Sequence, residues 1–236
     1  MDCNGRLSGC YAYSATMKIE VNAGSKRYGR NVVFENQSLC IPSGSLVAVL
    51  GDNGQGKSTL IECIYGLQEM NEGELLWDGK SFDRHDIEMR KRAFYMPDLP
   101  PFNMQLDGLS ELAKWFSIWG VKDGEGQGVE ACLDRLEQFN VMEQAGRTLN
   151  KLSRGELYKV ALSGFLSLGA DLWILDEPLA SGMDSKGIEA FKACCWEAIK
   201  KGTTIIYTTQ LEELAHELST EICRVEGVNV FLEGVK

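Results

Sequence analysis

The chain has 236 residues, of which 44% are hydrophobic and 25% charged, and its formal net charge is −10. This length and composition are typical of one globular domain with a full hydrophobic core. No apolar run is long enough to cross a bilayer, and the N-terminus lacks the basic, apolar and small-residue succession of a signal peptide. The negative charge argues against broad, non-specific binding to nucleic acid, so we expect no nucleic-acid partner.

The cysteine pattern argues against a zinc site. The eight cysteines include no C-x-x-C pair, and the two histidines are His85 and His216. Cys40 and Cys63 lie in apolar, periodic segments and are predicted to be core residues. Without a secretion signal, the simplest interpretation is a reduced, cytosolic compartment.

The first fifty residues are predicted to be mostly antiparallel β-structure behind a disordered tail. The tail covers residues 1–16, which show no periodicity, and Met17 is a candidate for the true start. Strands are predicted where apolar and polar side chains alternate, at residues 17–21, 32–35 and 37–41, with a turn at 26–30.

A glycine-rich stretch after residue 50 carries the most specific motif of the chain. An apolar strand over residues 46–50 precedes it and a helix from Thr59 follows it, which is the context that G-x-x-x-x-G-K-[ST] requires. Glycines let the backbone wrap around an anion, and the helix start adds a positive dipole end. We expect Lys57 to reach the β- and γ-phosphates of a nucleotide and Ser58 to hold Mg²⁺. The predicted phosphate-binding residues are Gly51, Asp52, Asn53, Gly54, Gln55, Gly56, Lys57, Ser58 and Thr59.

The middle of the chain is predicted to form a helical subdomain over about residues 98–160. Two helices with apolar spacing are predicted at 109–119 and 129–139, with a glycine-rich loop at 120–128 between them. Short strands at 75–77 and 93–96, with a helix or turn at 87–92, connect this part to the phosphate loop.

Beyond residue 150, helices alternate with buried strands, which predicts a parallel sheet with crossover helices. The predicted helices cover residues 157–168, 184–201 and 211–218, and the predicted strands 171–178, 203–208, 221–225 and 228–232. Asp176 and Glu177 follow four apolar residues, at the strand end where open α/β sheets bind ligands. We expect Asp176 to hold Mg²⁺ and Glu177 to polarise an attacking water. The alternative is a solvated acidic turn.

The order of these motifs resembles the nucleotide-binding domain of ABC ATPases over about residues 17–233. The motifs are an aromatic turn at Tyr28, the phosphate loop, the helical insertion, the segment Leu152-Ser153-Arg154-Gly155-Glu156 and the acid pair. The resemblance implies ATP and Mg²⁺ as cofactors and an α/β fold of the P-loop NTPase (RecA-like) kind. That fold has a parallel-sheet core, an antiparallel β subdomain and an inserted helical subdomain. The resemblance also implies that Tyr28 stacks on adenine, although an aromatic residue in a loop equally suits core packing.

The segment L-S-R-G-E differs in part from the usual L-S-G-G-Q of that family. In the family this segment caps the ATP bound to the opposite subunit, which implies that Ser153, Arg154, Gly155 and Glu156 contact nucleotide across a dimer. Ser153 also suits the N-cap of a helix, and the two roles are compatible.

Three further positions depart from the family pattern. Asp98 stands where a glutamine usually touches Mg²⁺, so its carboxylate is a candidate metal ligand that adds negative charge near phosphate. Gln210 stands where a histidine usually contacts the γ-phosphate, and we expect it to share the catalytic site with Lys57 and Glu177. The turn at residues 179–184 is one residue longer than usual. We therefore expect an ATPase that is slow or strongly dependent on a partner.

Three functional hypotheses follow from the resemblance. The first is a cytoplasmic ATPase subunit on the inner face of the cell membrane, which powers a separate membrane-spanning subunit, of exporter type, through ATP-driven homodimerisation. The helical subdomain would dock that partner through apolar residues that equally suit a core, namely Pro100, Pro101, Phe102, Trp115 and Phe116. The second is a soluble, non-transport ABC ATPase, for example in iron–sulfur assembly, and the third is a slow or regulatory ATP-sensing module.

Overall fold

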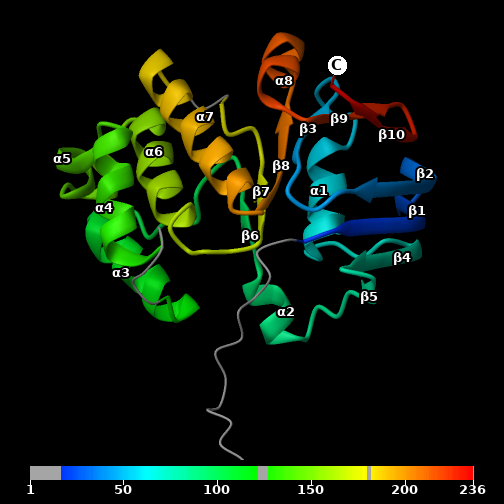
Figure 1. Cartoon of the computed structure of the whole chain (residues 1–236), viewed down its shortest axis with the longest axis horizontal. Coiled ribbons are helices and arrows are strands. Elements are labelled where there is room, and N and C mark those ends of the chain that lie inside the picture. Colours follow the sequence, from blue (N-terminus) through cyan, green and yellow to red (C-terminus); the bar gives the residue numbers. More distant parts are fainter. Residues whose placement is uncertain (1–16, 122–126, 180–181, 236) are drawn as a thin grey trace, which may run out of the picture.

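The computed structural model describes residues 17–121, 127–179 and 182–235, which form two β-sheets and a set of helices (Figure 1). The predicted tail at 1–16 and parts of the predicted loops at 120–128 and 179–184 lie outside these residues. Within the described ranges, no helix is both long and apolar enough to cross a membrane.

An antiparallel sheet with the strand order β2-β1-β4-β5 forms one side of the molecule. Its strands are β1 (Ile19–Tyr28), β2 (Asn31–Ile41), β4 (Glu72–Trp77) and β5 (Lys80–Ser81). The predicted turn at 26–30 was too long, because β1 continues to Tyr28. The two strands predicted at 32–35 and 37–41 form the single strand β2. Asn36 has a positive φ of 51° and the β1–β2 register shifts nearby, so the side-chain alternation breaks without ending the strand.

The second sheet has six strands in the order β10-β9-β3-β8-β7-β6. They are β3 (Leu46–Leu50), β6 (Ala93–Met96), β7 (Leu172–Leu175), β8 (Thr204–Thr209), β9 (Glu221–Glu226) and β10 (Asn229–Gly234). All neighbours pair in parallel except β9 and β10, which form an antiparallel hairpin. The predicted parallel sheet is thus confirmed, and its central strands β3, β7 and β8 are buried along their whole length.

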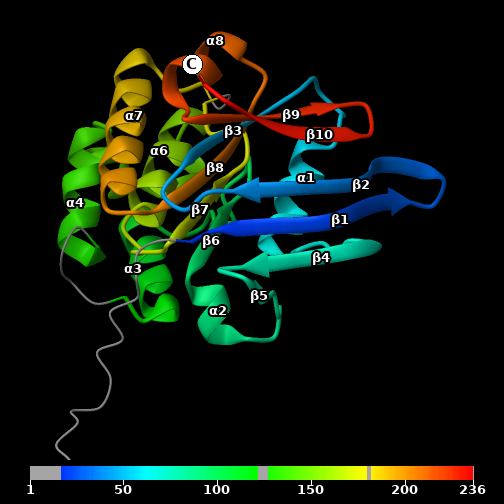
Figure 2. The same cartoon turned by 45° about the vertical axis from the view of Figure 1, so that its right-hand side comes forward.

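Helix α1 (Lys57–Tyr65) lies between the two sheets (Figure 2). Its apolar side chains share one buried cluster with residues from both sheets, including Leu60 and Ile61 of the helix, Val49 and Ile206 of the parallel sheet, and Ile19 of the antiparallel sheet. This packing fixes the helix start against the carboxyl ends of β3 and β8. The phosphate loop, which joins β3 to α1, is therefore held from both sides.

The remaining helices, apart from α2 (Ile87–Lys91), cover the opposite face and one end of the parallel sheet, whereas α2 contributes Met89 to the cluster around α1 (Figure 1). The covering helices are α3 (Gly108–Trp119), α4 (Gly128–Gln138), α5 (Met142–Ala145), the 3₁₀ turn η1 (Leu149–Lys151), α6 (Arg154–Phe165), α7 (Ser185–Lys200) and α8 (Glu212–Leu218). Helices α3 to α6 pack on one another at the end of the molecule away from the antiparallel sheet. Helix α6 begins three residues earlier than predicted, because Ser153 and Glu156 form a capping box at its start.

Several apolar side chains lie elsewhere than the sequence predicts. Phe102, Trp115 and Phe116 are each less than 10% exposed and belong to the core, so they do not supply a docking surface. Conversely, Cys40 is exposed, which corrects its prediction as a core residue. Cys63 is buried, as predicted.

Candidate nucleotide-binding site

Two positions of the loop at residues 51–56 adopt backbone conformations that favour glycine. Gly54 and Gly56 have φ angles of 80° and 95°, and a Cβ atom on Gly56 would lie 2.3 Å from Cγ1 of Val33. Helix α1 then begins at Lys57 without a side-chain cap. The amide groups of its first turn have no intrahelical acceptor, so the loop ends in a helix N-terminus suited to phosphate.

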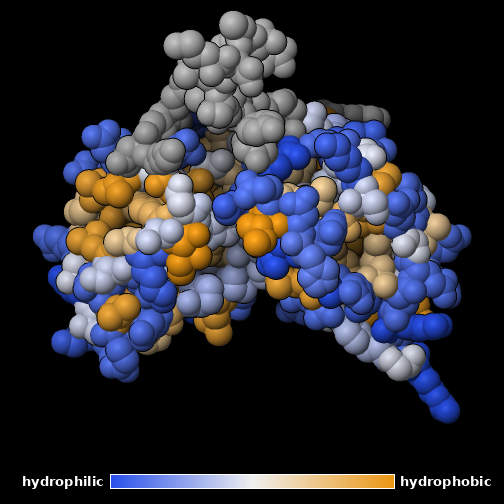
Figure 3. Space-filling model, turned by 90° about the horizontal axis from the view of Figure 1, so that it is seen from below, coloured by the Kyte–Doolittle hydropathy of each residue, from blue (hydrophilic) through white to orange (hydrophobic). Residues whose placement is uncertain are grey.

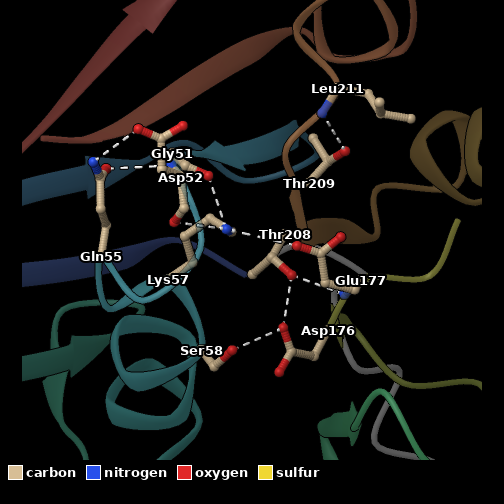
Figure 4. A network of polar contacts seen from close by, with 10 residues as sticks. All are labelled: Gly51, Asp52, Gln55, Lys57, Ser58, Asp176, Glu177, Thr208, Thr209 and Leu211. Carbon is tan, nitrogen blue, oxygen red and sulfur yellow. Dashed lines mark hydrogen bonds and ion pairs between the residues drawn. The ribbon is translucent and has the colours of Figure 1, made fainter. Parts of the chain in front are cut away.

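Lys57 is the buried cation of this site, with 6% of its surface exposed. Its Nζ donates to the carbonyl oxygens of Gly51 at 2.8 Å and Asp52 at 3.2 Å. The same Nζ lies 3.6 Å from Oε1 of Glu177 (Figure 4). The ammonium group therefore connects the glycine-rich loop with the acid pair at the end of β7.

Asp176 is buried just after β7 and accepts hydrogen bonds from two hydroxyl groups. Oδ1 accepts from Oγ of Ser58 at 3.1 Å and from Oγ1 of Thr208 at 2.7 Å. The hydroxyl of Tyr95 lies 3.5 Å from Oδ2, and burial together with the charge of Asp176 raises the pKa of Tyr95, so the phenol stays protonated. Hydroxyl and carboxylate oxygens are the ligands that Mg²⁺ prefers, so Ser58 and Asp176 fit the predicted metal site chemically.

Glu177 is held in an unusual backbone conformation that turns its carboxylate toward Lys57. Its φ is 47°, a left-handed value that costs a non-glycine residue about 1–2 kcal/mol. Its amide donates to Oγ1 of Thr208 at 2.8 Å, which stabilises this conformation. Thr208 thus accepts from Glu177 and donates to Asp176, and it sets both acids in place from the neighbouring strand β8 (Figure 4).

Asp52 and Gln55 close the loop on itself. The amide of Asp52 donates to Oε1 of Gln55, and Nε2 of Gln55 donates to Oδ2 of Asp52, both at 3.3 Å. Gln210 is exposed and lines a cavity of about 330 Å³ together with these two residues and Arg224. The structure therefore places Gln210 beside the loop, and its catalytic role stays a prediction. Of the other predicted phosphate-binding residues, Asn53 lies at the exposed tip of the loop and Thr59 lies in helix α1.

Tyr28 ends β1 and is 47% exposed, so it is not a core residue. The Nζ of Lys26 lies over its ring, 4.8 Å from the ring centroid. Lys26 itself is buried and donates to the carbonyl oxygen of Glu69 at 2.7 Å. The ammonium is thus fixed beside the ring, and part of Tyr28 is exposed. Its contact with adenine stays a prediction.

The L-S-R-G-E segment forms the start of helix α6. Oγ of Ser153 accepts from the amide of Glu156 and donates to its carboxylate at 2.8 Å. Hydrogen bonds from Ser153 lower the pKa of Glu156. Arg154 forms an ion pair with Asp98, and Gly155 follows it in the first turn. Among the described residues, no hydrogen bond or ion pair joins this segment to the phosphate loop, so one chain brings together only the loop and the acid pair.

Sequence reasoning missed three residues that the structure brings into the site. Thr208 and Tyr95 touch Asp176 from the two strands beside β7, and the Nζ of Lys26 lies over the ring of Tyr28. A usable signal was a hydroxyl near the carboxyl end of a buried strand, which Thr208 provides. Lys26 and Tyr28 are two positions apart on one strand, which places them on the same face.

The fold and the site together define a P-loop ATPase. The family model for the ABC transporter matches residues 34–180. The "cytochrome c biogenesis ATP-binding export protein CcmA" of Nitrosomonas europaea is 29% identical over 184 residues, which cover 78% of this chain and 84% of that protein. The "SkfA peptide export ATP-binding protein SkfE" of Bacillus subtilis is 32% identical, over 70% of this chain and 67% of that protein.

Among solved structures, one described as an "ATP binding subunit of ABC transporter" superimposes with a TM-score of 0.83 at 26% sequence identity. The match covers 92% of this chain and 90% of the other. The chain belongs to the ABC transporter family and is an ATP-binding, ATP-hydrolysing subunit of the kind found in these transporters.

Proposed function

We propose that this chain hydrolyses ATP to power a separate membrane-spanning subunit, and that the transporter is of the exporter type. The export proteins of Nitrosomonas europaea and Bacillus subtilis support the direction. The chain would work in the cytoplasm, held on the inner face of the cell membrane by its membrane partner. The observation that carries the ATPase part is the network that joins Lys57, Glu177, Thr208, Asp176 and Ser58 at one sheet edge (Figure 4).

In this proposal each residue of the network has a distinct role. Lys57 binds the β- and γ-phosphates, where phosphate oxygens replace its present carbonyl acceptors. Ser58 and Asp176 hold Mg²⁺, which neutralises phosphate charge when bound. Glu177 accepts a proton from, and orients, the attacking water. Gln210 donates a hydrogen bond to the γ-phosphate. Asp98, which the sequence predicts as a metal ligand, is paired with Arg154 in the free chain, and a metal role for it is the alternative to that pairing.

Two copies of the chain would complete two nucleotide sites. The start of α6 contributes Ser153, Arg154, Gly155 and Glu156 to the ATP bound by the other copy. The separation of this segment from the phosphate loop within one chain supports that arrangement, because the helix N-terminus then has no phosphate partner of its own.

The surface for the membrane partner would lie on the helical subdomain, residues 98–160. Figure 3, seen from below, shows apolar residues gathered over the side that carries this subdomain. Its large exposed apolar side chains include Leu99 and Ile118, which are 63% and 67% exposed. Exposed apolar side chains in such number favour a partner surface.

Replacement of Glu177 by Gln tests the catalytic part. The amide keeps the shape and the nearby hydrogen bonds but cannot accept a proton, so we expect ATP turnover to fall at least 100-fold while ATP binding is retained. Turnover is measured as phosphate release, and binding with a fluorescent ATP analogue. Equal turnover of both proteins would show that Glu177 is not the catalytic residue.

Co-purification tests the transport part. The tagged chain, expressed in its own cells and extracted with detergent, should retain a membrane-spanning protein. Retention of soluble partners alone would favour a non-transport ABC ATPase, for example in iron–sulfur assembly. Tight ATP binding with no turnover, alone or with the membrane protein, would favour an ATP-sensing module.

A further inference from the structure

Asp98 and Arg154, two residues that depart from the family pattern, are joined to each other. Nη2 of Arg154 and Oδ1 of Asp98 form an ion pair at 2.5 Å. Asp98 lies in the segment that leaves strand β6 toward the helical subdomain, and Arg154 is the first residue of helix α6. The pair thus connects the segment beside the parallel sheet with the part of the chain that would face a second copy.

The pair has little to do with fold stability. The side chains of Arg154 and Asp98 are 52% and 43% exposed, and exposed pairs of this kind contribute little because water and salt screen them. The consequence of the pair is therefore positional: it determines where the guanidinium group points.

Arg154 also sits at an electrostatically unfavourable place. It occupies the first turn of α6, where the helix dipole favours negative groups. The nearest acid in that turn, Glu156, is already bonded to the amide and hydroxyl of Ser153. Asp98 is the anion that Arg154 contacts in the free chain. An incoming phosphate would be a stronger anion for the same guanidinium.

We propose that Asp98 is a latch for Arg154, and that the phosphate groups of ATP on a second copy compete with Asp98 for this guanidinium. In the free chain the carboxylate holds Arg154 back against its own subunit. On assembly Arg154 leaves Asp98 and contacts the γ-phosphate across the interface. Because Asp98 competes for Arg154, the chain needs a higher ATP concentration to dimerise than a variant without this carboxylate would need. This inference rests on the proposed ATP-driven dimer.

A double-mutant cycle in the Glu177→Gln background tests the latch. The dimer fraction is measured by sedimentation velocity as a function of ATP concentration, with Mg²⁺ constant. Asp98→Asn, which keeps the shape but removes the charge, should lower the ATP concentration for half-dimerisation at least threefold. Arg154→Gln should raise it at least threefold, because the cation for the phosphate is lost. In the Arg154→Gln background, Asp98→Asn should have no effect.

Two controls separate the latch from general charge effects. Glu143→Gln removes an acid from another exposed ion pair of the helical subdomain, with Arg147, and should leave dimerisation unchanged. The gain from Asp98→Asn should also shrink at about 0.5 M salt, where an exposed pair is screened.

The outcomes distinguish the latch from the function on which it rests. Independent, additive effects of Asp98→Asn and Arg154→Gln overturn the latch while leaving the dimer in place. If Asp98→Asn weakens ATP-dependent dimerisation to the same extent with Arg154 present and with Arg154→Gln, Asp98 is a metal ligand and the latch is wrong. Absence of any ATP-dependent dimer for the Glu177→Gln parent overturns the proposed dimer and the latch together.

Discussion

The ammonium of Lys57 lies 3.6 Å from the carboxylate of Glu177, and only 6% and 19% of these side chains are exposed. This ion pair spans the opening between the phosphate loop and the end of β7. A γ-phosphate that binds Lys57 would enter between the same two groups, and the pair marks where phosphate and attacking water would meet.

Replacement of Lys57 by Met should weaken ATP binding about 10- to 150-fold, because a charge-assisted hydrogen bond is worth about 1.5–3 kcal/mol. Titration with a fluorescent ATP analogue measures the change. Lys91→Met is the matched control, because Lys91 forms an exposed pair with Glu88 away from the site. Equal affinities of the two variants would contradict the role of Lys57.

Replacement of Thr208 by Val should lower the free energy of unfolding by about 1–3 kcal/mol, because Asp176 and the amide of Glu177 both lose a buried partner. Turnover should fall as well, since the backbone of Glu177 is no longer held. Urea unfolding and phosphate release measure the two effects. Thr208→Ser keeps the hydroxyl and should therefore keep most of the stability and most of the turnover. A Val variant as stable as the Ser variant would contradict the bridging role of Thr208.

Replacement of Lys26 by Met should reduce ATP affinity about two- to fivefold, the range expected for a lost cation–π contact of about 0.5–1 kcal/mol. The loss of affinity should come only from the contact between Tyr28 and the adenine base of ATP. Competition by inorganic tripolyphosphate, which has no base, should therefore be unchanged, whereas a parallel loss for tripolyphosphate would indicate damage to the phosphate loop. Thermal unfolding checks that loss of the bond to Glu69 has not disrupted β1.

The thiols should differ sharply in alkylation by iodoacetamide at pH 8. Burial raises the pKa of Cys63 to about 11 and that of Cys132 to about 12, so about a thousandth or less of either is thiolate at that pH. Of the six cysteines that the structure describes, Cys40 is the exposed one and should react before the other five. Peptide-by-peptide mass spectrometry follows each site, with urea-unfolded protein as the control. Rapid native labelling of Cys63 would mean that the helix between the two sheets opens readily.

Much of the nucleotide site depends on short stretches of sequence and could be predicted from them. A strand, six loop residues and a helix start are contiguous from Leu46 to Lys57, so their spacing alone indicates a phosphate loop. Asp176 and Glu177 are likewise set by one apolar strand and the turn after it. The parallel sheet followed from the alternation of helices and strands, because parallel neighbours need a crossover.

Other features depend on contacts between residues far apart in the chain, and only the tertiary structure decided them. Thr208 reaches Asp176 because β8 and β7 are neighbours in the sheet, and Trp115 is buried because α3 packs against α6. The pairing of Asp98 with Arg154 joins residues 56 positions apart. A sequence pattern indicates local backbone geometry and which face of an element is apolar. These long-range contacts instead depend on how the sheets and helices pack, and that packing is determined by interactions along the whole chain.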